Sequence, residues 1–230
     1  MVASRDTLRG LEDAMELRLF PLHTVLFPGM ALPLNIFEPR YLQLVDECTR
    51  DDEPFGVALI REGPEVGGFA VPYDVGTTAR IEVAEPGMLN RISLLARGEQ
   101  RFRITELHHD RPYLWADAEL IVEPSADSPD DLRERAREQL SAFAQLRSRA
   151  RGEYERDPGD EPPNGAAALA DAICATGAGA ADERQRLLET LDPGERLARA
   201  VEMFEEILEL LRRRVDEAAV QRWNEPGGLN

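Results

Sequence analysis

The first quarter of the chain alternates short apolar runs with turns, a pattern typical of β structure with one embedded helix. Glu16–Leu22 and Ala31–Phe37 are apolar runs, and the sequence Phe27-Pro28-Gly29 between them is typical of a turn with positive φ at the glycine. Pro39 suits the first turn of a helix, where its missing N–H has no intrahelical partner. Phe55–Ile60 is a continuous apolar run, as in a buried strand. We therefore predict two strands, a helix beginning at Pro39 and a third strand.

Between Asp74 and Glu123 the apolar positions recur with a period of two, which predicts half-buried strands. The alternating apolar positions are Ala79, Ile81 and Val83; Ile92, Leu94 and Ala96; Phe102 and Ile104; and Leu114, Ala116, Ala118 and Leu120. Turn signals at Pro86-Gly87, Gly98 and Arg111-Pro112 separate these segments. Four short strands at this spacing indicate a barrel or sandwich rather than a βαβ unit.

Beyond Ser128 the period becomes helical, with Ser128 as a predicted N-cap and Pro129 as the first helical residue. Helices are predicted at Ala166–Ala175, from Asp182, and after Pro193. The last helix carries an apolar stripe at steps of four and three: Leu197, Val201, Phe204, Leu208, Leu211 and Val215. Flanking apolar residues widen the stripe, so we expect it to form the core of a helical bundle rather than a dimer seam.

Charge and composition exclude several chemistries. The chain has 27 basic residues, all of them arginine, against 44 acidic residues, for a formal net charge of −17. Without lysine there is no Schiff-base lysine, no Ser–Lys dyad and no Walker-type phosphate loop. The acidic balance also disfavours nucleic acid and anionic membranes as partners.

The cysteines and the N-terminal segment indicate the compartment. Cys48 and Cys174 lie in apolar stretches far apart and form no C-x-x-C motif, so we expect two buried thiols in a reducing environment. The N-terminal residues lack the apolar core of a signal peptide. A cytoplasmic protein is expected.

The histidines offer a weak case for a metal. His108 and His109 precede Asp110, but neighbouring residues on a strand point to opposite faces, and His23 is the one other histidine. We therefore expect a surface turn here, with no metal site, no cofactor and no catalytic residue.

A dense block of motifs resembles the N-terminal domain of Lon ATP-dependent proteases, and in particular the stand-alone bacterial proteins built from that domain. The block comprises Leu19-Phe20-Pro21-Leu22, Val25-Leu26-Phe27-Pro28-Gly29, Leu32-Pro33-Leu34 and Ile36-Phe37-Glu38-Pro39-Arg40-Tyr41. Weaker matches follow at Val75-Gly76-Thr77, Gly98, Arg101-Phe102, Pro112-Tyr113-Leu114 and Gln185–Leu197. The resemblance covers roughly residues 16–215.

This resemblance implies an α+β fold, with a PUA-like β pseudo-barrel followed by a C-terminal helical bundle. The expected division is an N-terminal tail at 1–15, a β domain at 16–124, a helical subdomain at 125–222 with a loop at 152–165, and a C-terminal tail at 223–230. The ATPase and protease motifs of Lon do not occur, so neither activity is expected of this chain.

The resemblance further implies a non-enzymatic module that binds unfolded or hydrophobic polypeptide segments, with a protease or chaperone as a further partner. Its candidate binding surface is Phe20, Phe27, Met30, Phe37 and Arg40. Each apolar member also fits a core role, because large apolar side chains are usually buried. Arg40 likewise fits a structural role beside the helix start, bridging an internal acid.

Two other functions are weighed against this hypothesis. A small-molecule-binding protein or enzyme using the barrel mouth predicts a deep pocket where groups such as Arg40, Arg101 and Arg103 converge. RNA binding rests on analogy with other PUA-like domains, and the acidic charge opposes it.

Overall fold

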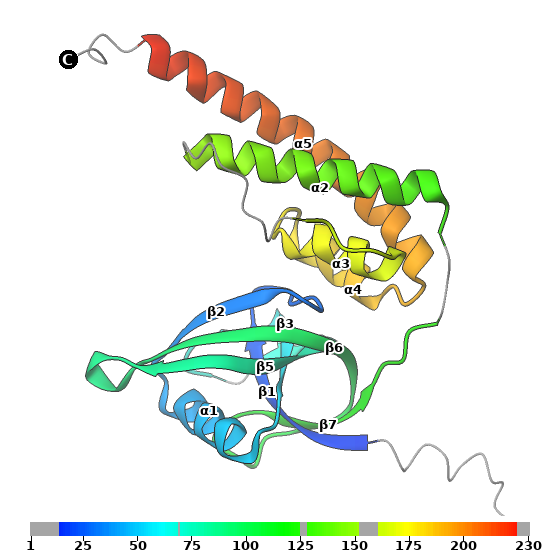
Figure 1. Ribbon diagram of the computed structural model, residues 1–230. Helices are drawn as coiled ribbons and strands as arrows, with labels where there is room; N and C mark the ends of the chain where they lie inside the picture. Colours follow the sequence, from blue (N-terminus) through cyan, green and yellow to red (C-terminus); the bar gives the residue numbers. More distant parts are fainter. Residues whose placement is uncertain (1–13, 69, 125–127, 152–160, 225–230) are drawn as a thin grey trace, which may run out of the picture. The chain divides into compact units, whose positions relative to one another are not determined.

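The computed structural model describes residues 14–68, 70–124, 128–151 and 161–224, in two compact units (Figure 1). The first unit runs to Glu123 and includes the distant segment Ala181–Glu189. The second unit comprises the segments 124–180 and 190–230. Residues 1–13, 152–160 and 225–230, which contain most of the predicted tails and loop, lie outside the described residues.

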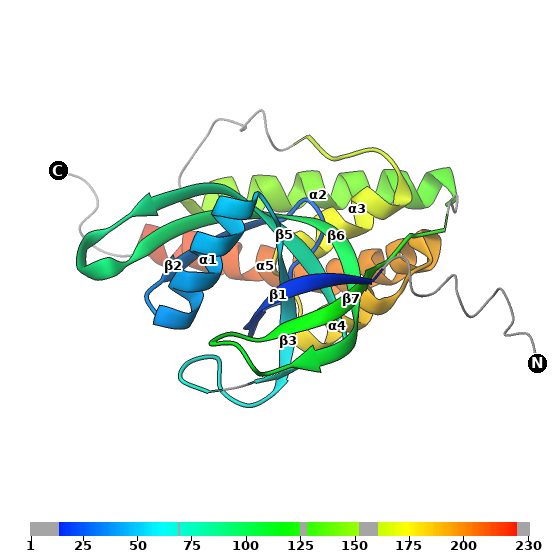
Figure 2. The ribbon, with the colours of Figure 1, turned by 90° about the horizontal axis from the view of Figure 1, so that it is seen from below.

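The first unit is built on a seven-stranded sheet that closes on itself. Neighbouring strands in the ring follow the order β1, β7, β6, β5, β3, and a parallel pairing of β1 with β3 closes it, while β2 pairs with β6 (Figure 2). The strands are β1 (Ala14–Leu22), β2 (Ala31–Ile36), β3 (Phe55–Glu62), β4 (Val71–Pro72), β5 (Val75–Pro86), β6 (Ile92–His108) and β7 (Trp115–Leu120). The ring and the helices beyond it confirm the expected α+β pseudo-barrel fold.

The prediction of two strands separated at Gly98 is wrong, because β6 runs unbroken through that glycine. The loop between β1 and β2 passes directly over Gly98, where a Cβ atom would lie 2.3 Å from the carbonyl oxygen of Phe27. The backbone N–H of Gly98 donates to the carbonyl of Met30 (2.9 Å), and that of Gly29 donates to the carbonyl of Gly98 (2.8 Å). The glycine is therefore a point of close backbone approach rather than a strand end.

Helix α1 (Pro39–Asp51) begins at the predicted proline, with Glu38 at the N-cap position. Its buried face places Tyr41, Leu44, Val45 and Cys48 in a core shared with β1, β3 and β6. Both cysteines are buried free thiols, as predicted. Burial raises the pKa of Cys48 to about 11, so this thiol stays protonated and unreactive at neutral pH.

A network of ion pairs joins β1 to α1 and to the residues that follow this helix. The guanidinium of Arg18 contacts carboxylates of Glu47 (3.2 Å), Asp51 (2.7 Å) and Glu53 (2.6 Å). The hydroxyl of Tyr113 also donates a hydrogen bond to Glu47. These contacts stabilise the carboxylate, and the Tyr113 hydrogen bond is the largest cause of the lowered pKa of Glu47.

Helix α4 (Ala181–Glu189) completes the first unit, although the sequence placed it in the helical subdomain. Its buried Arg184 and Gln185 donate to the carbonyl oxygens of Val25 (2.9 Å) and Val75 (3.0 Å). In return, the buried Arg101 of β6 donates to the carbonyl of Leu188 (3.1 Å). These bonds satisfy backbone groups that burial would otherwise leave unpaired, which explains the placement.

The described part of the second unit contains three helices, α2 (Asp130–Arg151), α3 (Ala166–Ala175) and α5 (Pro193–Asn224). The first four residues of the predicted stripe on α5, Leu197 to Leu208, are buried, which confirms its role in a bundle core. A buried ion pair joins α5 to α3, with Arg196 Nε 3.3 Å from Asp171 Oδ1. Among the described helices, none has the length and apolar character needed to cross a membrane.

We expect Gly98→Ala to destabilise the protein by roughly 1–3 kcal/mol, because the new methyl group would press against rigid backbone at Phe27. Urea unfolding measures the change in free energy. Gly87→Ala is the matched control, since its added Cβ atom meets nothing closer than 3.4 Å. Equal stability of Gly98→Ala and the wild type would contradict the close approach.

We expect Glu47→Gln to flatten the loss of stability at acid pH. The folded-state pKa of Glu47 lies below its ordinary value of 4.5, so its contribution is present above that pH and lost as the pH falls below it. Free energies of unfolding measured from about pH 6 to about pH 3 test this linkage. Glu62→Gln, at an exposed glutamate, is the control for net charge. An equal flattening in both variants would argue against a specific role of Glu47.

Candidate functional site

Some of the residues that the sequence predicts for a binding surface are buried in the structure, and others are exposed. Phe20 and Phe27 are buried, and Phe20 stacks on Tyr41 with ring centroids 3.9 Å apart. Met30 is half-buried against the same core. Phe37 is 51% exposed. Of these four residues, Phe37 thus offers substantial apolar surface, while Phe20 and Phe27 have the core role that the sequence also allowed.

The side chain of Arg40 is bound to the loop between β3 and β4 and does not project into solvent. Its guanidinium donates to the carbonyl oxygens of Gly68 and Glu65 (3.1 Å) and to the carboxylate of Glu38 (3.0 Å). It also lies over the ring of Tyr41, 4.5 Å from the centroid. Contacts within the fold therefore balance the positive charge of Arg40 and accept hydrogen bonds from its guanidinium.

The arginines expected at a barrel mouth have three different surroundings. Arg101 is buried against Leu188 and Glu123, Arg40 holds the loop at Gly68, and Arg103 is exposed on β6. The structure contains a shallow polar groove of about 220 Å³ in the second unit, between α2 and α5. Its lining includes Arg135, Glu138, Glu205 and Arg212, which are charged surface residues of two packed helices.

An exposed apolar patch lies at the tip of the β5–β6 hairpin. We define this hairpin patch as Phe37, Met88 and Leu89, with Arg91 at its edge. Met88 and Leu89 are 88% and 90% exposed. Three paired positions, Ile36 of β2, Ile92 of β6 and Pro86 of β5, form one row beneath it. Arg91 lies 5.8 Å from the Phe37 ring centroid, so these two side chains, which follow the row on β2 and precede it on β6, are neighbours.

Leu89 of the hairpin patch has an unfavourable backbone conformation. Met88–Asn90 form a 3₁₀ turn, in which Leu89 and Asn90 have φ of 59° and 57°. For a residue such as leucine, the left-handed region costs about 1–2 kcal/mol. A fold that accepts strain and exposes two large apolar side chains at one place has a feature typical of binding sites.

Sequence reasoning missed Met88 and Leu89, although a signal was present. Pro86-Gly87 predicted a turn, and turns between strands are normally polar. Two large apolar residues directly after that signal were the anomaly that pointed to an exposed patch.

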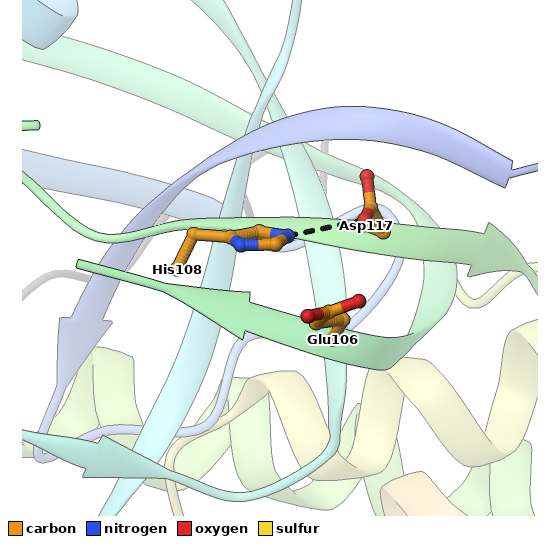
Figure 3. A group of neighbouring side chains, drawn as sticks. All are labelled: Glu106, His108 and Asp117. Carbon is orange, nitrogen blue, oxygen red and sulfur yellow. Dashed lines mark hydrogen bonds and ion pairs between the residues drawn. The ribbon is translucent and has the colours of Figure 1, made fainter. Parts of the chain in front are cut away.

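A second cluster lies at the far end of β6. Glu106 and His108 of β6 meet Asp117 of β7, and their ligand-type atoms all lie within 4.8 Å of one another (Figure 3). His108 Nε2 is 3.0 Å from Asp117 Oδ2. In the described part of the chain these are the side chains arranged to hold a metal ion. The sequence pattern around His108 points to His109, Asp110 and the distant His23, and does not reveal Asp117, the partner on the neighbouring strand.

The comparisons with known proteins agree with the fold. The family model of the ATP-dependent protease La (LON) substrate-binding domain matches residues 16–206. The Lon protease of Syntrophus aciditrophicus is 30% identical over 82% of this chain, and Lon protease 2 of Myxococcus xanthus is 30% identical over 85%. These matches cover 25% and 24% of the two relatives, so the chain spans about a quarter of the curated relatives it matches.

Two solved structures share the architecture. The Lon N-terminal domain protein from Xanthomonas campestris is 28% identical, with a TM-score of 0.61 over 80% of this chain and 95% of that one. The N-terminal domain of Mycobacterium avium complex Lon protease has a TM-score of 0.60 at 21% identity, over 83% and 98% of the two chains, which shows the fold. By the family match and these relatives, the chain belongs to the Lon substrate-binding domain family.

Proposed function

We propose that this chain binds unfolded or hydrophobic segments of other polypeptides and catalyses no reaction itself. Membership of the Lon substrate-binding domain family supports a substrate-binding module. The matches cover about a quarter of the curated Lon proteases, and the motifs of the ATPase and protease parts of Lon do not occur in this sequence. A cytoplasmic protein that works beside a protease or chaperone fits this role.

The observation that carries the proposal is the exposure of the hairpin patch. Soluble proteins rarely leave neighbouring large apolar side chains fully in water unless a partner covers them. Methionine and aromatic side chains adapt to varied apolar surfaces, which suits a site that must accept many sequences. Phe37, Met88 and Leu89 therefore supply the adaptable part of the binding surface.

Charge supplies a second element of recognition. Arg91 is exposed beside Phe37, where a guanidinium can contact carboxylates or backbone carbonyls of a bound segment. The surrounding protein carries a large negative charge, which repels acidic chains and favours neutral or basic unfolded segments. We thus infer a preference for apolar segments flanked by few acidic residues.

The other two hypotheses gain no support from the site. A small-molecule enzyme needs converging ionisable groups in a pocket, whereas Arg40 and Arg101 are bound to backbone carbonyls of the fold and Arg103 is exposed. RNA binding needs a basic surface, and the formal net charge of −17 opposes it.

We expect the double variant Met88→Ser with Leu89→Ser to weaken binding of an unfolded polypeptide by at least tenfold. Burying one such side chain contributes about 1.5–3 kcal/mol, and about 1.4 kcal/mol corresponds to a factor of ten. Fluorescence anisotropy of a labelled, permanently unfolded model protein without excess negative charge, such as reduced and carbamidomethylated ribonuclease A, measures the affinity. We expect micromolar binding by the wild type.

Val122→Ser is the matched control, because Val122 is 85% exposed but lies outside the hairpin patch. It should bind as the wild type does. Absence of binding by the wild type would overturn the proposed function itself. Wild-type affinity in the double variant would instead show that the contacts lie elsewhere on the surface.

A further inference from the structure

Three acidic residues form a row across neighbouring strands of the first unit. Glu16 of β1 pairs with Asp117 of β7, and Asp117 pairs with Glu106 of β6. Directly paired residues lie on the same face, where like charges destabilise a sheet. The pKa of Glu16 reflects this: hydrogen bonding from Arg111 lowers it most, while the charge of Asp117 acts to raise it.

Of the three carboxylates in this row, only that of Glu16 is bound by an arginine that the structure describes. Arg111 binds both carboxylate oxygens of Glu16, at 2.6 and 2.9 Å. Among the ion pairs of the described residues, Asp117 pairs with His108, and none joins an arginine to Glu106 or Asp117. With neutral His108, the three carboxylates and one guanidinium carry two net negative charges, which a divalent cation would balance.

A β-bulge creates the meeting of Glu106 and Asp117. The register between β6 and β7 shifts between Ile104 and Glu106, so that Glu106 lies opposite Asp117 rather than opposite Ala116. The hydroxyl of Thr105, at the bulge, donates to the backbone carbonyl of Asp117 (2.9 Å). Bulges often redirect side chains at functional positions, and this one brings a second carboxylate to the imidazole.

The imidazole itself is held in position. The rings of His108 and Trp115 stack with centroids 3.9 Å apart. Trp115 is held in turn, because its indole N–H donates to Asp110 (2.6 Å) and the Arg111 guanidinium lies 4.3 Å from its ring centroid. Packing of this kind fixes the ring plane, so Nε2 remains directed toward Asp117 (Figure 3).

From this arrangement we propose that Glu106, His108 and Asp117 bind one divalent transition-metal ion, with Zn²⁺ as the ion of choice. His108 Nε2 and one carboxylate oxygen from each acid are the ligands, and water completes a tetrahedron. Protein ligands lie about 2.0–2.2 Å from Zn²⁺, and thus roughly 3–4 Å from one another, which small side-chain rotations provide here. The imidazole selects Zn²⁺ over Mg²⁺ and Ca²⁺, which prefer oxygen ligands alone. The ion replaces the His108–Asp117 hydrogen bond and ties β6 to β7.

Isothermal titration of the full, chelator-treated chain with Zn²⁺ near neutral pH tests the site. We expect one ion per chain, with affinity unaffected by excess Mg²⁺. His108→Gln should weaken binding at least tenfold, and Glu106→Gln should weaken it severalfold. His109→Gln is the matched control, because this exposed neighbour lies outside the cluster and should leave the affinity unchanged.

Glu106→Gln also separates loss of a ligand from loss of fold, because Glu106 is exposed and its replacement leaves the core intact. Absence of Zn²⁺ binding by the wild type, wild-type affinity in Glu106→Gln, or equal weakening by His108→Gln and His109→Gln would each overturn the proposal. The variant of Met88 and Leu89 should bind Zn²⁺ normally, so this outcome is independent of polypeptide binding.

Discussion

The first unit depends on a single long strand that is never interrupted. β6 pairs with β2 and β5 along its first half and with β5 and β7 along its second half. At Gly98 between these halves, the β1–β2 loop passes so close that no side chain fits. The absence of one methyl group therefore allows the loop to pack, keeps Phe27 buried, and lets one strand span the whole barrel. The candidate functional features lie at the two ends of this strand, at the hairpin tip and at the bulge near His108.

The sequence predicted correctly those strands and helices that depend on nearby residues, such as a proline at a helix start or a regular spacing of apolar positions. Pro39 marks the start of α1, and the periods of two and of 3.6 identify the strands and the helices of the second unit. The family block implied the fold class through its resemblance to the Lon N-terminal domain, and its motifs lie in β1, β2, the loop between them and the start of α1. The error at Gly98 is of a different kind. A glycine that ends a strand and a glycine that admits a neighbouring backbone look alike until the neighbour is known.

The features of the candidate sites were hidden for the same reason. Glu106 meets Asp117 only because the register shifts at Thr105, and no pattern within either strand shows that shift. The burial of Phe20 and Phe27, in contrast to Phe37, depends on what packs over each residue in three dimensions. Met88 and Leu89 are unusual in the sequence because they are large apolar residues directly after a turn signal. That they are exposed is known only from the structure, which leaves the hairpin tip uncovered. Exposure is a property of the assembled chain, so the sequence predicts candidates for a surface more readily than the surface itself.

The placement of α4 has a consequence for how this protein can be divided. The chain leaves the first unit after Glu123, returns to it for Ala181–Glu189, and leaves again at Thr190. A β unit expressed without that returning segment would lack the donors that satisfy the carbonyls of Val25 and Val75, and Arg101 would lose its acceptor at Leu188. The two units are thus interwoven along the chain, and recombination or proteolytic dissection at a single junction would not release an intact barrel.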